Sequence, residues 1–169
     1  RLPLTSDLAQ LAAELDREIE AATARPTYLT LFVGILDGER QTLRYVNAGQ
    51  NPPILVRASG ESVRLDPTGR PLALLSGGTY EERSVSIGNG DAFVLYTDGL
   101  VESESDQGEP FGLARLEGVL AEARTASPGE ILARIDSAAR AHRANTEPAD
   151  DATVVVLRVG PAPLPQASV

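Results

Sequence analysis

Residues 28–47 read YLTLFVGILDGERQTLRYVN, and this stretch decides the fold class. Apolar side chains alternate with others along residues 28–36 and again along residues 41–47, which is the pattern of half-buried β-strands. Asp37-Gly38 lies between the two runs and is typical of a hairpin turn. Because strands joined by a tight turn run antiparallel, we predict an antiparallel hairpin here.

Further strands and helices are predicted on both sides of this hairpin. The strands cover residues 54–57, 62–65, 80–87, 92–97 and 152–159. The first helix begins at Leu8 and is ended by Arg25-Pro26. The other two cover about residues 113–124 and run from the capping sequence Ser127-Pro128-Gly129-Glu130 through His142. Residues 92–97 are almost continuously apolar, which indicates a strand buried on both faces. Helices that gather near the ends of the chain, instead of alternating with strands, predict an α+β fold with helices covering sheet faces.

Composition excludes several classes of protein. The chain has 169 residues and a mass of 17.8 kDa, the size of one domain. It contains no Cys and one His, which excludes disulfides, a Cys nucleophile and metal sites built from several His. The net charge of −9 argues against a nucleic-acid partner, because such proteins normally carry a basic face. No apolar run approaches the roughly 18 residues of a membrane span, so we expect a soluble, cytoplasmic protein.

Two acidic segments stand where predicted buried strands end or begin. Asp98-Gly99 directly follows the strand at residues 92–97, and Asp150-Asp151 precedes the last strand. If these two strands are antiparallel neighbours, Asp98 and Asp150 converge on one edge of a sheet. Converging carboxylates repel each other unless a cation lies between them, and carboxylate oxygens favour Mg²⁺, Mn²⁺ or Ca²⁺.

Each of these segments also has a structural interpretation. An Asp-Gly pair after a strand, such as Asp98-Gly99, most often forms a turn. Asp150-Asp151 fits a solvated acidic loop as well as it fits a metal site. The segment after Asn47 fits a rigid turn set by Gly and Pro. His142, in the last turn of its helix, is placed to interact with the carbonyls of the helix end.

Short motifs also follow one another in a fixed order between about residue 4 and residue 159. They are TLFVGILD (30–37), LRYVNAG (43–49), NPP (51–53), GRPL (69–72), GD (90–91), LYTDG (95–99), GEPFG (108–112) and DDAT (150–153). In order and spacing, this set resembles the SpoIIE/RsbU-like branch of the metal-dependent protein phosphatases, the PPM family. Each motif alone is short, and the ordered set is specific.

The resemblance implies a β-sandwich flanked by helices, with two Mn²⁺ or Mg²⁺ ions at one edge. It implies that water activated by these ions attacks phosphoserine or phosphothreonine, so no side chain is expected to act as the nucleophile. Carried over by motif, Asp98 and Asp150 would be metal ligands, with Gly99, Asp151 and Asn47 beside them. The usual substrate in this branch is a phosphorylated anti-anti-sigma-type protein of bacterial stress or sporulation signalling. The sequence leaves open whether the domain forms a homodimer.

Three departures from the family pattern stand out. The family has an upstream Gly-Asp…Gly-His-Gly segment whose Asp bridges the two metals, and this chain starts just after the expected place. We therefore expect a piece of a longer protein, with an incomplete phosphatase domain at residues 1–159, its first strands missing, and a Pro-rich tail at 160–169. The family's Asn-Ala-Gly-His ends in Gln50 here, which cannot titrate near neutral pH. The family's Pro-Leu-Gly ends in Ala73, which is expected to alter a loop.

Three functions remain open from the sequence. The first is a bacterial serine/threonine phosphatase domain. The second is a catalytically degenerate, phosphatase-like module that binds a signalling partner, which Gln50 and the missing bridging Asp motivate. The third is a structural domain stabilised by Ca²⁺. The metal dependence of activity and of melting distinguishes the three.

Overall fold

The computed structural model describes residues 7–23, 27–144, 146 and 150–160. Its helices are α1 (Leu8–Ala22), α2 (Asp98–Val101), α3 (Gly112–Glu122) and α4 (Pro128–Arg143). Its strands are β1 (Leu31–Asp37), β2 (Thr42–Ala48), β3 (Ile54–Val56), β4 (Ser62–Arg64), β5 (Arg83–Ser86), β6 (Ala92–Tyr96) and β7 (Val154–Arg158). The order of elements is the predicted one, with the short helix α2 added after β6.

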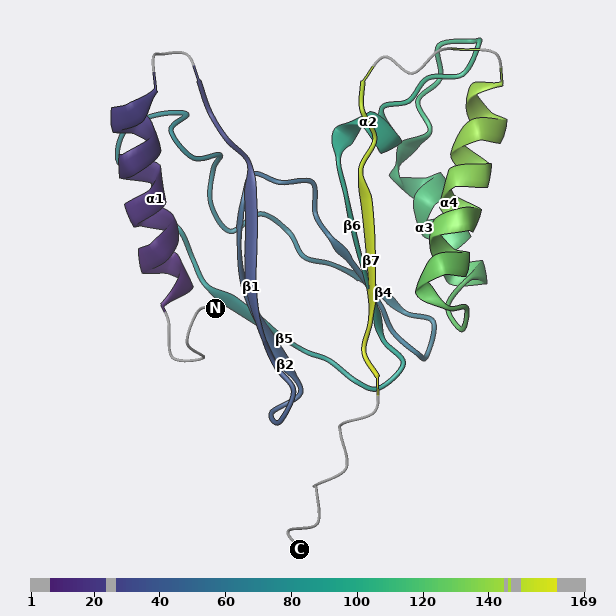
Figure 1. Cartoon of the computed structure of the whole chain (residues 1–169), viewed down its shortest axis with the longest axis horizontal. Coiled ribbons are helices and arrows are strands. Elements are labelled where there is room, and N and C mark those ends of the chain that lie inside the picture. Colours follow the sequence, from purple (N-terminus) through teal and green to yellow (C-terminus); the bar gives the residue numbers. More distant parts are fainter. Residues whose placement is uncertain (1–6, 24–26, 145, 147–149, 161–169) are drawn as a thin grey trace, which may run out of the picture.

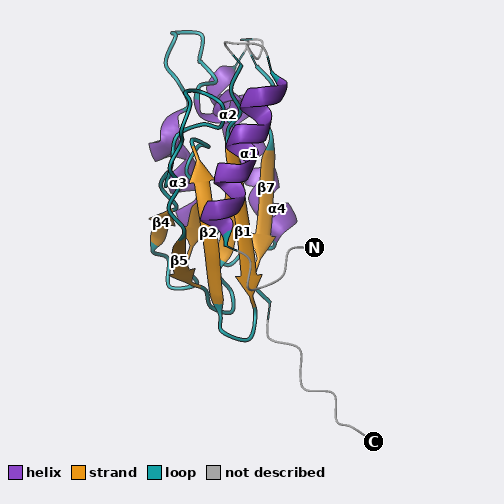
Figure 2. Ribbon diagram, turned by 90° about the vertical axis from the view of Figure 1, so that its left-hand side faces the viewer, coloured by secondary structure: helices purple, strands orange, loops and turns teal. Residues whose placement is uncertain are grey.

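The strands form two antiparallel sheets that pack face to face (Figure 1). The first sheet has the order β1-β2-β5, and the second has the order β4-β3-β6-β7. Helix α1 covers the outer face of the first sheet, while α3 and α4 cover the outer face of the second (Figures 1 and 2). These four layers confirm the predicted α+β sandwich flanked by helices. Strand β5 lies at a sheet edge.

Three apolar clusters hold the layers together. Between the sheets, Tyr45 of β2 and Phe93 of β6 are buried, and the rings of Phe32 and Tyr45 stack with centroids 5.5 Å apart. The cluster under α1 contains the buried residues Leu8, Ala12, Ile35 and Val46. The largest cluster joins β3 and β6 to α3 and α4, and includes Ile54, Val94, Leu116, Leu120, Ile131 and Ile135. Each helix therefore buries one face of its apolar pattern against a sheet.

The hairpin that decides the fold pairs β1 with β2, from Leu31 opposite Ala48 to Asp37 opposite Thr42. Its turn is longer than the two-residue turn that Asp-Gly usually forms, because it occupies residues 38–41. The Asp37 carboxylate closes this turn by accepting the amides two and three residues further on, at 3.1 and 3.0 Å. The prediction of a hairpin is confirmed, and the strands are shifted by one to three residues.

Two acidic side chains fix helix α1 to the sheet. One is Glu82, outside the helix, and the other is Asp16, on the buried face of the helix. At its first turn, the Leu8 amide donates to Glu82 at 3.1 Å, and Glu82 also accepts a two-pronged bond from Arg44 of β2 at 2.7 and 2.8 Å. The pairing with Arg44 lowers the pKa of Glu82 more than burial raises it, so this pKa lies below its ordinary value. A carboxylate at a helix N-terminus is favourable because the free amides point toward it.

The second acidic side chain is Asp16, which is only 1% exposed. It accepts the amides of Ala73 at 2.7 Å and Gly78 at 3.2 Å, and it lies 3.7 Å from the Arg70 guanidinium. Burial raises the pKa of Asp16, but these amides, the Tyr80 hydroxyl and Arg70 together lower it more, so the net pKa is below the ordinary value. Burial, with the Asp16 charge, raises the pKa of Tyr80 to about 12. We refer to these five residues as the Asp16 cluster.

Ala73 has a left-handed backbone, with φ of 58°. The family pattern has Gly at this place, and only Gly adopts such a φ without a steric cost. Ala73 therefore carries backbone strain that Gly would not carry. The hydrogen bond from the Ala73 amide to Asp16 helps to hold the residue in this conformation.

Helix α4 begins as predicted, because Ser127 and Glu130 form a capping box with Pro128 at the first turn. Its buried residues are Ile131, Ile135 and Ala139, while Ala138 is only partly buried. One detail differs from expectation. His142 bonds to the Glu109 carbonyl at 2.8 Å instead of to its own helix end.

The sheets leave one edge of the sandwich apolar and open among the described residues. Strands β1 and β7 are the end strands of their sheets there, and both lie toward the same side of the molecule. Leu36 on β1 and Val155 and Leu157 on β7 are 55%, 44% and 56% exposed. Among the described helices, none combines the length and the hydropathy that crossing a membrane requires. The predicted tail lies, from residue 161, outside the described residues.

Candidate metal centre

Strand β6 is the element that positions the candidate site. It pairs with β3 on one side and β7 on the other, and four of its five residues are buried. Its apolar sequence thus fits a strand that is covered on both faces, as predicted. Because β6 is held on every side, the direction in which the chain leaves it after Tyr96 is fixed.

The pairing of β6 with β7 brings the two acidic segments together. Tyr96 lies opposite Val154, and beyond the ladder the Thr97 amide donates to the Thr153 carbonyl at 3.1 Å. The Thr153 amide in turn donates to the Thr97 hydroxyl at 2.9 Å. The condition set in the sequence argument, that these strands are antiparallel neighbours, is therefore met. We refer to Asp98, Asp150 and Asp151 as the acidic edge.

Gly99 allows a close approach of two backbones at this edge. A Cβ atom built on Gly99 would lie 2.5 Å from the Asp151 carbonyl oxygen, so any side chain here would push the two segments apart. Asp98 is the first residue of helix α2, which corrects the expectation of a plain turn. The chain coils here because Leu100 is buried in the apolar cluster beneath it.

The two predicted ligands are exposed and nearly free of partners. Within the described residues, the Asp98 carboxylate accepts only the Gly99 amide, at 3.0 Å, and the Asp150 carboxylate accepts only the Asp151 amide, at 2.7 Å. No ion pair among the described residues reaches either of them. The described residues contain no group of three or more Asp, Glu, His or Cys that could hold a metal ion. The edge therefore supplies carboxylate oxygens for a cation without completing a site.

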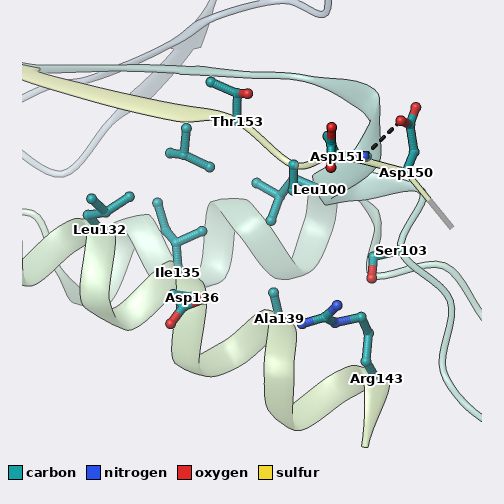
Figure 3. Close-up of a pocket in the computed structure, with 13 residues that line it drawn as sticks. Leu100, Ser103, Leu132, Ile135, Asp136, Ala139, Arg143, Asp150, Asp151 and Thr153 are labelled. Atoms are coloured by element: carbon teal, nitrogen blue, oxygen red, sulfur yellow. Dashed lines mark hydrogen bonds between the residues drawn. The ribbon is translucent and has the colours of Figure 1, made fainter. Parts of the chain in front are cut away.

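A cavity of about 540 Å³ opens beside the acidic edge, between α4 and the start of β7 (Figure 3). It is lined by Gly99, Leu100 and Ser103, by Leu132, Ile135, Asp136, Ala139 and Arg143 of α4, and by residues 150–154. A second hollow of about 420 Å³ shares Gly99, Ser103 and Asp150 with it. Three of the predicted site residues, Gly99, Asp150 and Asp151, thus come together in one cavity. Asp98 does not line it and lies one residue away along the chain.

Asn47 reaches this region only indirectly. Its side chain is fully buried, donates to the Leu65 carbonyl at 3.0 Å, and accepts the Gln50 amide at 2.8 Å. Gln50 then crosses from the first sheet to the second, where its side-chain amide donates to the Tyr96 carbonyl at 3.1 Å. The turn after Asn47 is therefore a connection between the two sheets, and it holds the chain two residues before Asp98.

Arg143 lines the cavity from α4 and is not among the residues predicted from the sequence. A basic residue in the last turn of a helix is common for electrostatic reasons alone, so its position gave no signal of function. Ser103 also lines the cavity, and its place depends on how the chain leaves α2.

Comparisons with known proteins show similarity in sequence and in fold. Residues 2–160 match the family model described as "Stage II sporulation protein E (SpoIIE)". Protein IcfG of Synechocystis sp. is 31% identical over 130 residues, which are 77% of this chain and 20% of IcfG.

Two solved structures share the fold. The SiaA-PP2C domain of Pseudomonas aeruginosa is 21% identical with a TM-score of 0.79, over 90% of this chain and 61% of that chain. The structure of the RsbU and RsbW domains of Rv1364c from Mycobacterium tuberculosis is 28% identical with a TM-score of 0.73, over 94% and 45%. The chain thus spans between one fifth and about three fifths of the length of these proteins.

Proposed function

Since the chain belongs to the SpoIIE family, we propose that it takes part in metal-dependent hydrolysis of phosphoserine or phosphothreonine on a protein. One observation carries this proposal. The pairing of β6 with β7 places two exposed aspartate segments at one sheet edge, where neither Asp98 nor Asp150 has a cationic partner among the described residues. Such an arrangement costs repulsion energy unless a cation binds.

The donor set fits Mn²⁺ or Mg²⁺, because exposed carboxylate oxygens are the ligands that hard divalent ions prefer. Asp98 and Asp150 would hold the metal, and the further ligands that two ions need would come from outside the described residues. When bound, such ions neutralise phosphoryl charge and activate water.

The residues of this chain hold the edge in place. Gln50 fixes the Tyr96 carbonyl, the buried Leu100 fixes helix α2, and Gly99 lets the Asp151 backbone approach. Gln50 has no titratable proton near neutral pH, so its part is to orient the chain. Groups held this rigidly lose little entropy when they bind a ligand.

For the substrate, we propose a phosphorylated anti-anti-sigma-type protein in the bacterial cytoplasm. The match to a protein that carries RsbU and RsbW domains supports this choice, at 28% identity. The net charge of −9 means that the long-range field repels a phosphoprotein, so attraction has to come from metals and local cations.

The test uses the full-length protein, a phosphoserine protein substrate and a titration with Mn²⁺. Wild type should hydrolyse the substrate only with metal, and Asp98→Asn and Asp150→Asn should each lower kcat/KM by at least about 100-fold. Mn²⁺ at a hundred times its Kd should also stabilise folded wild type by about 2.7 kcal/mol, which appears as a higher melting temperature. It should leave the melting temperature of Asp98→Asn unchanged. Asp106→Asn, at an exposed acid that lines neither cavity, is the matched control.

A degenerate, partner-binding module is the second candidate, favoured by Gln50 and by the incomplete ligand set of the described residues. It predicts tight binding of a phosphoprotein without hydrolysis at any Mn²⁺ concentration. Stabilisation by Ca²⁺ with neither hydrolysis nor phosphoprotein binding would instead favour a structural metal site. Full metal-dependent activity in Asp98→Asn would contradict the assignment of Asp98 as a ligand.

A further inference from the structure

We propose that the cavity between α4 and the start of β7, which we name the α4 groove, binds the substrate segment beside the phosphoserine. Within it, Arg143 selects a substrate that carries an acidic side chain at one flanking position. This proposal rests on the proposed phosphatase function, because it takes the acidic edge as the place of the phosphoryl group. Gly99 and Asp150 line the α4 groove, so a chain whose phosphoserine reaches the edge would continue into it.

The floor of the α4 groove is apolar and preformed. Leu100, Ile135 and Ala139 line it and are 3%, 1% and 8% exposed, so they are held in the core. Leu132 stands at the α4 side with 43% of its surface exposed. A volume of about 540 Å³ accommodates a few side chains of an extended segment. An apolar residue of the substrate would therefore replace water over this floor.

The charges along the α4 groove leave one cation unused. Arg143 is the one basic residue among the described residues that line either hollow at the acidic edge. Asp136, two turns earlier on α4, is already matched, because both of its oxygens accept from Arg140 at 2.9 Å. The half-buried Arg143 side chain makes no hydrogen bond or ion pair within the described residues, so its guanidinium is available for a ligand.

The position of Arg143 favours an acidic flank over the phosphoryl group as its ligand. In Figure 3 the Arg143 side chain extends from α4 toward the groove, with Ser103 between it and the segment that carries Asp150. The phosphoryl group belongs at the metal ligands, on the Asp150 side. Arg143 on the opposite wall can then pair with a carboxylate a few residues away in the substrate. A single cation in an acidic surface gives selectivity and register more than overall attraction.

The experiment measures binding and hydrolysis separately with the full-length protein. The probes are fluorescein-labelled phosphoserine peptides that contain leucine and one glutamate, which is moved through successive positions on both sides of the phosphoserine. Binding is measured by anisotropy in EDTA, and hydrolysis is measured with Mn²⁺ as kcat and KM. The variants are Arg143→Gln, Arg143→Glu and, as matched control, Arg134→Gln, which changes an exposed arginine of α4 that lines neither hollow.

In wild type, glutamate at one flanking position should tighten binding about tenfold relative to glutamine, since a charge-assisted pair forms there. Arg143→Gln should remove this preference, through KM when the peptide is hydrolysed. Arg143→Glu should reverse it, so that lysine at the same position binds better than glutamate. Arg134→Gln should keep the wild-type preference.

Three results would overturn the proposal: no position in wild type prefers glutamate, Arg143→Gln keeps the preference, or Arg134→Gln removes it equally. A preference that depends on Arg143 in EDTA, without hydrolysis in Mn²⁺, would support the α4 groove while removing the phosphatase function. The two hypotheses can therefore fail independently.

Discussion

The carboxylates of the Asp16 cluster and of the acidic edge differ in burial and in the number of their hydrogen-bond partners. Asp16 is buried at 1% exposure, and its two oxygens accept two backbone amides and face an arginine. Asp98 and Asp150 are exposed, and each accepts only the amide of the residue that follows it, within the described residues. One carboxylate has its charge satisfied by the fold itself, and the other two do not.

The number of donors around a carboxylate distinguishes a structural acid from a candidate functional one. A buried carboxylate survives only if donors replace the lost water, so the partners of Asp16 are part of the folded state. Among the described residues, Asp98 and Asp150 each have only the amide of the next residue and no arginine, although a rigid strand holds their segments at one place. A carboxylate that is positioned but unsatisfied is ready for a ligand from solution. This contrast can be tested by mutation.

The largest expected effect is on stability. Asp16→Ala should lower the free energy of unfolding by about 3 kcal/mol, because two amides would lose their acceptor and the Arg70 guanidinium would lose the carboxylate that faces it at 3.7 Å. Asp98→Ala in EDTA should change it by less than about 0.5 kcal/mol, because the side chain is exposed. Urea denaturation of both variants measures the difference. Equal losses would show that the comparison is wrong.

A part of the Asp16 effect should depend on pH. Since the native pKa of Asp16 is lowered from 3.8, its contribution is present above the unfolded pKa. It is lost as the pH falls from about 4 through the native pKa, because the unfolded state then binds the proton more readily. Asp16→Ala lacks this carboxyl, so its stability should fall less steeply than that of wild type over this range. Parallel stability curves in acid would argue against a charged Asp16 in the native state.

The smallest expected effect concerns the strained donor to Asp16. Ala73→Gly should raise stability by about 0.5 kcal/mol, since it removes a left-handed penalty of about 1 kcal/mol and adds the entropy cost of glycine. Ala133→Gly, at an exposed position within α4, should instead lower stability by about 1 kcal/mol. Thermal melting of the two variants provides the comparison. A loss at both positions would mean that the φ of Ala73 costs nothing.

Much of the fold and the outline of the acidic edge could be predicted from local pattern. The apolar run at residues 92–97 was sufficient to predict a buried strand, whereas its pairing with the last strand entered only as a condition, which the structure meets. The hairpin followed from alternation around Asp37, and the α4 capping box followed from Ser127 and Glu130. In each case, a few adjacent residues specify the structure.

The rest depends on contacts between distant parts of the chain. Asp16 looks like one more polar residue of an amphipathic helix, and it is buried only because the loop at residues 70–80 packs over it. Gln50 signals a lost proton function, but its bond to Tyr96 needs the two sheets to meet. Arg143 is an ordinary helix-end residue until the α4 groove is visible. The roles of Asp98, Asp150, Asp151, Gly99 and Asn47 in metal binding stay predictions.

Strand β7, which brings Asp150 to the acidic edge, is the last of the described strands in chain order. Strands β3 and β6 can pair as soon as residue 96 has left the ribosome, whereas the partner of β6 on its other side arrives about 60 residues later. During that interval a nascent chain presents Asp98 without Asp150. A copy released before Val154 therefore lacks the strand that pairs with β6 and holds Asp150 at the acidic edge.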